Sequence, residues 1–131
     1  MSEILLTGFA PFAGRPVNGS WQAVSRLAGM LSDQAVTAME IPVVWGQPLR
    51  MLRSQMETHL PHTIVSLGEG KPGCFQLEML ATNRRKPQQD NNGRLPDNLN
   101  IEPDGPPSRI SSAPLVSIRE KLRTSGVPVL L

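Results

Sequence analysis

The feature that most constrains this fold is the alternation of short β-rich runs with longer amphipathic segments. The β-rich runs lie near residues 3–7, 36–44 and 62–67, and apolar residues recur at helical spacing in 21–31 and 47–60. Strands that alternate with amphipathic helices indicate a parallel sheet covered by helices. We therefore expect an α/β fold, a three-layer αβα arrangement with a mainly parallel central sheet. Ser20 is the expected N-cap of the first helix, and Pro61 is expected to end the second.

The second half of the chain is less regular. Residues 75–81 fit a strand better than a helix, and residues 83–110 form a long polar excursion rich in Asn, Asp, Gly and Pro. Pro114 is expected to open another helix, and Gly126 to cap its end. The run 127–131 then predicts a buried strand. An α/β domain rarely stops on such a strand, so we expect a single domain over 1–131 that is incomplete at its C-terminus.

Composition excludes several classes of protein. Cys74 is the only cysteine, so no disulfide can form within the chain, which fits a reducing compartment. The sequence shows no signal segment and no apolar run of about 18 residues, so we expect a cytoplasmic protein without a membrane partner. The net charge is +2 and the arginines are scattered, so nucleic acid is not an expected partner. We expect neither a metal nor another cofactor.

A glycine-rich turn, 68–73, follows the third predicted strand and matches the pattern G-x-G-x-x-G. The dinucleotide fingerprint also requires a helix that starts at the turn, so that backbone amides face the pyrophosphate. Two interpretations are open. The turn either borders an active site, which we favour, or forms a nucleotide-binding module.

Cys74, His62 and Glu78 could in principle supply a nucleophile, a base and an orienting acid. A lone cysteine beside an apolar residue is more often a small buried hydrophobe, and we expect Cys74 to be structural. Glu78 interrupts an apolar pattern. It is either a solvent-facing strand residue or a buried acid that holds a histidine, which would fix the imidazole tautomer.

Several motifs resemble those of one family, and they occur in the same order along the whole chain. They are TGFAPFAG at 7–14, NGSW at 18–21, IPVVW at 41–45, LGEG at 67–70, LEMLATN at 77–83, RLPDN at 94–98, PDGP at 103–106 and GVPV at 126–129. By these motifs the chain resembles the N-terminal portion of the pyroglutamyl peptidase (pyrrolidone-carboxylate peptidase) family of cysteine peptidases.

The resemblance implies a function and a set of site residues. The family removes N-terminal pyroglutamate from peptides by hydrolysis with a cysteine nucleophile, and its members are usually homo-oligomers. Phe9 and Phe12 would pack on the pyrrolidone ring, and the Gly68 turn would border the pocket. Glu78 would orient the catalytic histidine, and Arg94 would help to stabilise the oxyanion. We therefore expect Glu78 to lie near Phe9 and Phe12, around one cavity.

The chain also departs from the family pattern. Gly19 replaces a proline, Glu69 and Gly70 replace a Gln-Ala pair, and about six extra residues precede Arg94. The family's A-G-x-x-x-C-N nucleophile segment and its later histidine have no counterpart here, and Cys74 is not at the nucleophile position. We therefore expect no peptidase activity from the 131 residues alone. A truncated, non-catalytic paralogue or subunit is the alternative interpretation.

Overall fold

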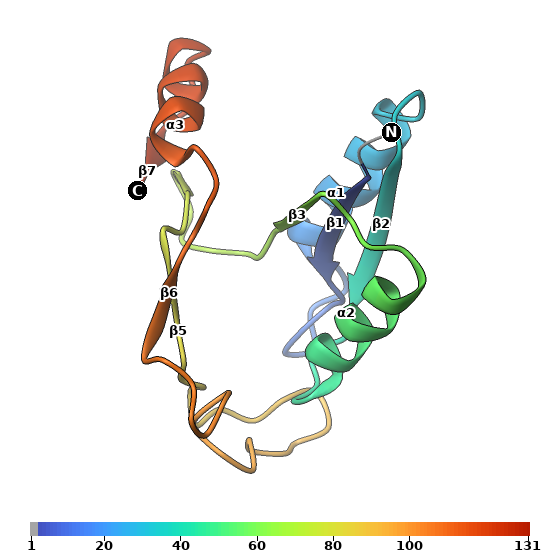
Figure 1. Cartoon of the computed structure of the whole chain (residues 1–131), viewed down its shortest axis with the longest axis vertical. Coiled ribbons are helices and arrows are strands. Elements are labelled where there is room, and N and C mark those ends of the chain that lie inside the picture. The colour runs from blue at the N-terminus through green and yellow to red at the C-terminus, as the bar shows by residue number, and fades with distance from the viewer. Residues whose placement is uncertain (1–2) are drawn as a thin grey trace. The chain divides into compact units, whose positions relative to one another are not determined.

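The computed structural model describes residues 3–131 (Figure 1). Its elements, in chain order, are β1 (Ile4–Phe9), α1 (Gly19–Met30), β2 (Val36–Ile41), α2 (Gln47–Thr58), β3 (Thr63–Ser66), β4 (Phe75–Gln76), β5 (Leu80–Thr82), β6 (Ser108–Ile110), α3 (Leu115–Thr124) and β7 (Val129–Leu130). They fall into two compact units. The first contains the chain up to Glu69 and residues 88–95, and the second contains residues 70–87 and 96–131.

The first unit is built on a three-stranded parallel sheet with the order β2-β1-β3. Across the sheet, the connection from β1 leads to β2 at one edge, and the connection from β2 leads back past β1 to β3 at the other edge. Right-handed crossovers of opposite direction place their helices on opposite faces, so α1 and α2 sandwich the sheet. The predicted α/β fold with a parallel sheet is confirmed, and the three expected strands lie in one sheet.

The central strand carries the core of this unit. Leu5 and Leu6 in β1 are almost completely buried, and Val24 packs from α1 with no exposed surface. β1 has a neighbouring strand on each side and α1 packs against it, which agrees with its continuous apolar run. In contrast, all four residues of the edge strand β3 are exposed.

Prolines and an asparagine set element ends that differ from the sequence prediction. β2 stops at Ile41 rather than residue 44, because Pro42 has no N–H to donate to the sheet. α2 ends at Thr58, since Pro61 disfavours helical geometry in the residue before it and the chain is already extended at His59. The N-cap of α1 is Asn18, not Ser20, because the Asn18 side chain accepts from the Ser20 N–H.

The second unit contains two small sheets and one helix. β4 pairs with β7 in parallel, and β5 pairs with β6 antiparallel, so the strand expected over 75–81 is split between two partners. The excursion 83–110 ends in β6. α3 packs on β7 and ends in a Schellman motif: Gly126 has a φ of 82°, and the Val127 N–H donates to the Leu122 carbonyl. The predicted cap at Gly126 is confirmed.

The terminal strand is shorter than expected. β7 contains only Val129 and Leu130, and of these only Val129 is buried. Within the part of the chain that the structure describes, no helix combines the length and the apolar content needed to cross a membrane.

Candidate active site

Four of the five predicted site residues belong to the first unit. Phe9 ends β1, Phe12 lies in the following loop, Gly68 follows β3, and Arg94 lies in the segment 88–95. Parallel strands end at the same edge of a sheet, so the loops after β1 and β3 emerge together. A Cβ added to Gly68 would lie 3.8 Å from the Phe9 ring, which shows that the Gly68 turn lies against this ring.

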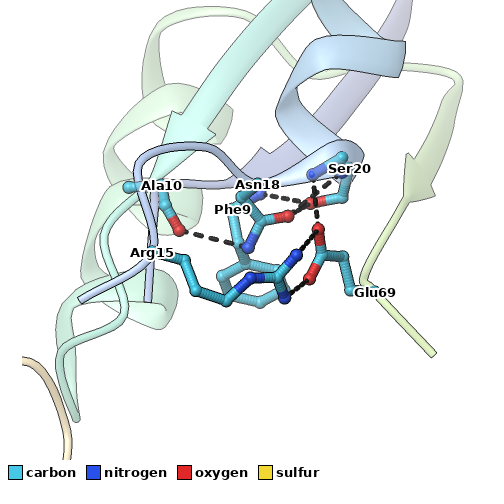
Figure 2. Close-up of polar contacts among 7 residues, drawn as sticks. Phe9, Ala10, Arg15, Asn18, Ser20 and Glu69 are labelled. Atoms are coloured by element: carbon cyan, nitrogen blue, oxygen red, sulfur yellow. Dashed lines mark hydrogen bonds and ion pairs between the residues drawn. The ribbon is translucent and has the colours of Figure 1, made fainter. Parts of the chain in front are cut away.

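Buried and partly buried hydrogen bonds fix the base of the loop that follows β1 (Figure 2). The Phe9 N–H donates to Ser20 Oγ at 2.9 Å, and the Ser20 hydroxyl donates to Asn18 Oδ1 at 2.7 Å. The Asn18 side-chain amide donates to the Ala10 carbonyl at 3.2 Å. One asparagine and one serine therefore cap α1 and hold the backbone at Phe9 at the same time.

Glu69, in the turn after β3, forms hydrogen bonds with the segment that joins β1 to α1 (Figure 2). Its Oε1 accepts from the Gly19 N–H at 2.6 Å, and its Oε2 accepts from Arg15 at 2.5 Å. The Gly19 hydrogen bond is the largest cause that lowers the pKa of Glu69, Arg15 lowers it further, and desolvation opposes both. The sequence marked Glu69 only as a departure from a motif, and it gave no reason to select Arg15.

Asp90 organises the turn that carries Arg94. Its carboxylate accepts from the Arg94 N–H at 3.0 Å, the Asn92 N–H at 2.9 Å and the Trp45 N–H at 3.0 Å. Asp90 is only 9% exposed. The Arg94 N–H bond is the largest cause of its lowered pKa, and desolvation opposes the shift. This residue was missed, although an aspartate before Asn-Asn-Gly is typical of a side chain that hydrogen-bonds the backbone of its own turn.

Further hydrogen bonds attach the Arg94 turn to the rest of the unit. The Asn91 side-chain amide donates to the Pro11 carbonyl at 2.8 Å, next to Phe12, and the Asn91 N–H donates to the Val43 carbonyl at 2.9 Å. Trp45 Nε1 donates to the Gln88 carbonyl at 2.8 Å. Residues 88–95 are therefore fixed to the loop that carries Phe12, which brings the backbone of the Arg94 turn to the same side of the unit.

The remaining candidates belong to other segments of the chain. Glu78 is exposed, in the irregular segment between β4 and β5, which agrees with a solvent-facing position, one of the two interpretations that the sequence left open, although this position is not in a strand; its catalytic role stays a prediction. Cys74 is half-buried just before β4. His62 is exposed and its Nδ1 lies 3.2 Å from Thr63 Oγ1.

The glycine-rich turn leads into a strand and not into a helix. After Gly73, which has a φ of 97°, the chain enters β4. A dinucleotide site needs a helix N-terminus facing the pyrophosphate, so the nucleotide-binding interpretation of 68–73 is wrong. Across residues 3–131, no group of three or more His, Cys, Asp and Glu side chains is placed to hold a metal ion.

The lowered pKa values of Glu69 and Asp90 predict acid sensitivity. A carboxyl group with a lower pKa in the folded state stabilises the fold above its unfolded pKa, and this stabilisation is lost as the pH falls. The free energy of unfolding should be level from neutral pH to about 5, and should then fall below about pH 4.

Urea unfolding from pH 7 to pH 3 measures this dependence. The Glu69→Gln, Asp90→Asn double variant should show a weaker dependence on acid than the native chain. The charge-matched control is Asp33→Asn, Glu57→Gln, which changes two exposed carboxylates. If the unfolding free energy fell equally steeply with pH in all three proteins, Glu69 and Asp90 would not be the source of the acid sensitivity.

Comparison with known proteins relates the chain to one family. The family model described as pyroglutamyl peptidase matches residues 2–131. The chain is 38% identical to the pyrrolidone-carboxylate peptidase of Gloeobacter violaceus, over 96% of this chain and 63% of that protein. It is 39% identical to the one from Streptomyces coelicolor, over 98% of this chain and 61% of that protein.

Solved structures show the same relationship. Pyroglutamyl peptidase I from Bacillus amyloliquefaciens superposes with a TM-score of 0.89 at 31% identity, covering 99% of this chain and 65% of that one. The pyrrolidone carboxyl peptidase of Fervidobacterium islandicum AW-1 gives 0.91 at 25% identity, with 99% and 64% covered. The chain thus spans less than two thirds of each of these relatives. With a family match over nearly all its residues, it belongs to the pyroglutamyl peptidase family.

Proposed function

We propose that this chain carries the pyroglutamate-binding part of a pyroglutamyl peptidase, which hydrolyses the amide bond after an N-terminal pyroglutamate. One observation carries the proposal: the Phe9 loop, the Gly68 turn and the Arg94 turn belong to one unit, in which hydrogen bonds join Phe9 to Ser20, Gly19 to Glu69, and Asn91 to Pro11. The relatives named above are pyrrolidone-carboxylate peptidases, which supports the same substrate class.

The chemistry of the ligand fits these residues. Pyroglutamate is a flat, uncharged lactam, so its recognition needs apolar contact with the ring and a few hydrogen bonds to the amide. Phe9 and Phe12 are only partly buried and offer aromatic surface. Gly68 has no side chain and leaves its backbone open beside the Phe9 ring. Phe9, Phe12 and Gly68 are therefore the proposed substrate-binding residues.

Two residues are proposed to act in the reaction itself. The exposed guanidinium of Arg94 can donate hydrogen bonds to the oxyanion that forms when a thiolate attacks the carbonyl carbon. Glu78 is proposed to accept from the imidazole that moves the proton, which fixes the tautomer of that ring. We also propose a cytoplasmic location, a single domain over 1–131 and a homo-oligomeric assembly.

The purified 131-residue chain is expected to bind pyroglutamyl peptides without hydrolysing them. The reaction needs a thiolate with an imidazole beside it. Cys74 and both histidines, His59 and His62, precede Glu78 in the sequence, and the family's nucleophile segment is absent from the 131 residues. Binding is measured by NMR titration with pyroglutamyl-alanine, and turnover is measured with a fluorogenic pyroglutamyl amide.

Matched controls make this result specific. Prolyl-alanine lacks the lactam carbonyl and should not shift the Phe9 and Gly68 signals. Phe12→Leu should weaken binding by roughly threefold to tenfold, whereas Phe75→Leu, at an exposed position in the second unit, should not. Absence of shifts with pyroglutamyl-alanine would contradict the binding role. Turnover that disappears in Cys74→Ser would show that Cys74 is a nucleophile after all.

A further inference from the structure

Two departures from the family motifs meet in space. Gly19 stands where the motif has proline, and Glu69 stands where the motif has glutamine. In this chain the Gly19 N–H donates to Glu69 Oε1 at 2.6 Å. Proline has no N–H, so this hydrogen bond can exist only because position 19 is not proline. The two departures are therefore physically linked, although they lie fifty residues apart.

Arg15 completes the arrangement. Its guanidinium donates to Glu69 Oε2 at 2.5 Å and, more weakly, to Oε1 at 3.4 Å. Arg15 directly follows the tip of the loop, where Ala13 and Gly14 have positive φ angles of 56° and 72°. The Glu69 carboxylate thus accepts hydrogen bonds from two places in this loop: from Arg15 next to its tip, and from Gly19 where α1 begins. Glu69 itself lies three residues after the end of β3 (Figure 2).

A carboxylate suits this position for an electrostatic reason. The first turn of α1 contains no acidic residue, and its free N–H groups carry partial positive charge. Glu69 supplies the missing negative charge from a different part of the chain. A charge-assisted hydrogen bond is stronger than a neutral one, and the Glu69 side chain is only 30% exposed.

We propose that Glu69 is a positioning residue, which together with Arg15 and Gly19 forms a latch that holds the Gly68 turn against the loop carrying Phe9. The latch sets the separation between the Phe9 ring and the Gly68 backbone. If the proposed function holds, this separation is where the lactam binds, so the latch tunes the affinity for pyroglutamyl peptides.

A double-mutant cycle in the full chain tests the latch without any ligand. Glu69→Ala should raise the unfolding equilibrium constant about fivefold in the native background. In the Gly19→Pro background the same change should have a clearly smaller effect, because the N–H is already gone. Proline is compatible with the first position of a helix, so Gly19→Pro should still fold. Equal effects in both backgrounds would overturn the latch.

A spectroscopic test follows the hydrogen bond itself. The Gly19 amide proton should move with pH as Glu69 is protonated in the native chain. It should not move in this way in Glu69→Gln, which keeps a neutral acceptor of the same shape. A Gly19 signal with the same pH dependence in both proteins would contradict the contact. Because Glu69→Gln is isosteric, this measurement stands even if Glu69→Ala folds poorly.

Binding of pyroglutamyl-alanine tests the positioning role. Glu69→Ala should weaken the affinity about tenfold, and Glu69→Gln should recover part of the loss. The matched control is Glu102→Ala, which removes an exposed ion pair to Arg109 in the second unit and should leave the affinity unchanged. Equal affinity of the native chain and Glu69→Ala would overturn the positioning role. If the native chain does not bind, the proposed function fails, while the cycle still decides the latch.

Discussion

Gly8→Ala is expected to destabilise the first unit by about 3 kcal/mol. A Cβ at position 8 would lie 2.7 Å from the Ser20 carbonyl oxygen and 2.8 Å from both the Ser20 carbonyl carbon and Trp21 Cα. All three are backbone atoms at the start of α1, so no side-chain rotation can relieve the clash. The helix or the strand would have to move, which would disturb the hydrogen bond from Phe9 to Ser20.

Urea unfolding followed by circular dichroism measures this loss. Gly29→Ala is the matched control: Gly29 lies in the same helix, and a Cβ there would meet no atom within 4 Å. It should leave the protein slightly more stable, by about 0.5–1 kcal/mol, because alanine favours a helix interior over glycine. Similar unfolding midpoints for the two variants would show that α1 does not approach β1 this closely.

Leu5→Ala is expected to cost about 2–5 kcal/mol of unfolding free energy. Leu5 is 1% exposed and lies in the central strand, paired with Thr37 on one side and Ile64 on the other. Shortening the side chain removes buried methyl groups and leaves a cavity between the sheet and its covering layer. A small domain has about 5–15 kcal/mol of stability in total, so this change alone could leave the unit partly unfolded.

The control for this variant is Leu60→Ala. Leu60 follows α2 and is 74% exposed, so its truncation should change the stability by less than about 0.5 kcal/mol. Both variants are compared by their unfolding midpoints and by hydrogen exchange of the β1 amides. If Leu5→Ala unfolds at the same urea concentration as Leu60→Ala, β1 is not the core of the unit.

The course of the chain through the first unit could be predicted from local patterns. The apolar run of β1 and the helical spacing in α2 depend on neighbours in sequence, so their existence and order were correct. The ends were less accurate. β2 ends at Ile41 and α2 ends at Thr58, in each case earlier than predicted, because a proline that follows in the sequence disfavours the strand or the helix already in the residues before it.

The site was only partly predictable, for a different physical reason. Phe9, Phe12, Gly68 and Arg94 lie in motifs that can be read along the sequence. The residues that hold them in place cannot be read in this way, because Glu69 bonds Arg15, 54 positions away, and Asp90 bonds Trp45, 45 positions away. Such pairs appear only once the sheet brings distant loops to one edge.

The path of the chain between the two units has a consequence for proteolysis and synthesis. It passes from one unit to the other three times, because residues 88–95 belong to the first unit while the residues on either side belong to the second. One cut at any of these passages divides the backbone into two fragments, and at least one of them contains residues of both units. Limited digestion should therefore give nicked molecules whose fragments stay associated through noncovalent contacts until they are denatured. On the ribosome, the first unit stays without its Asp90 turn until residue 95 has emerged, so this unit should complete folding late even though most of it is made early.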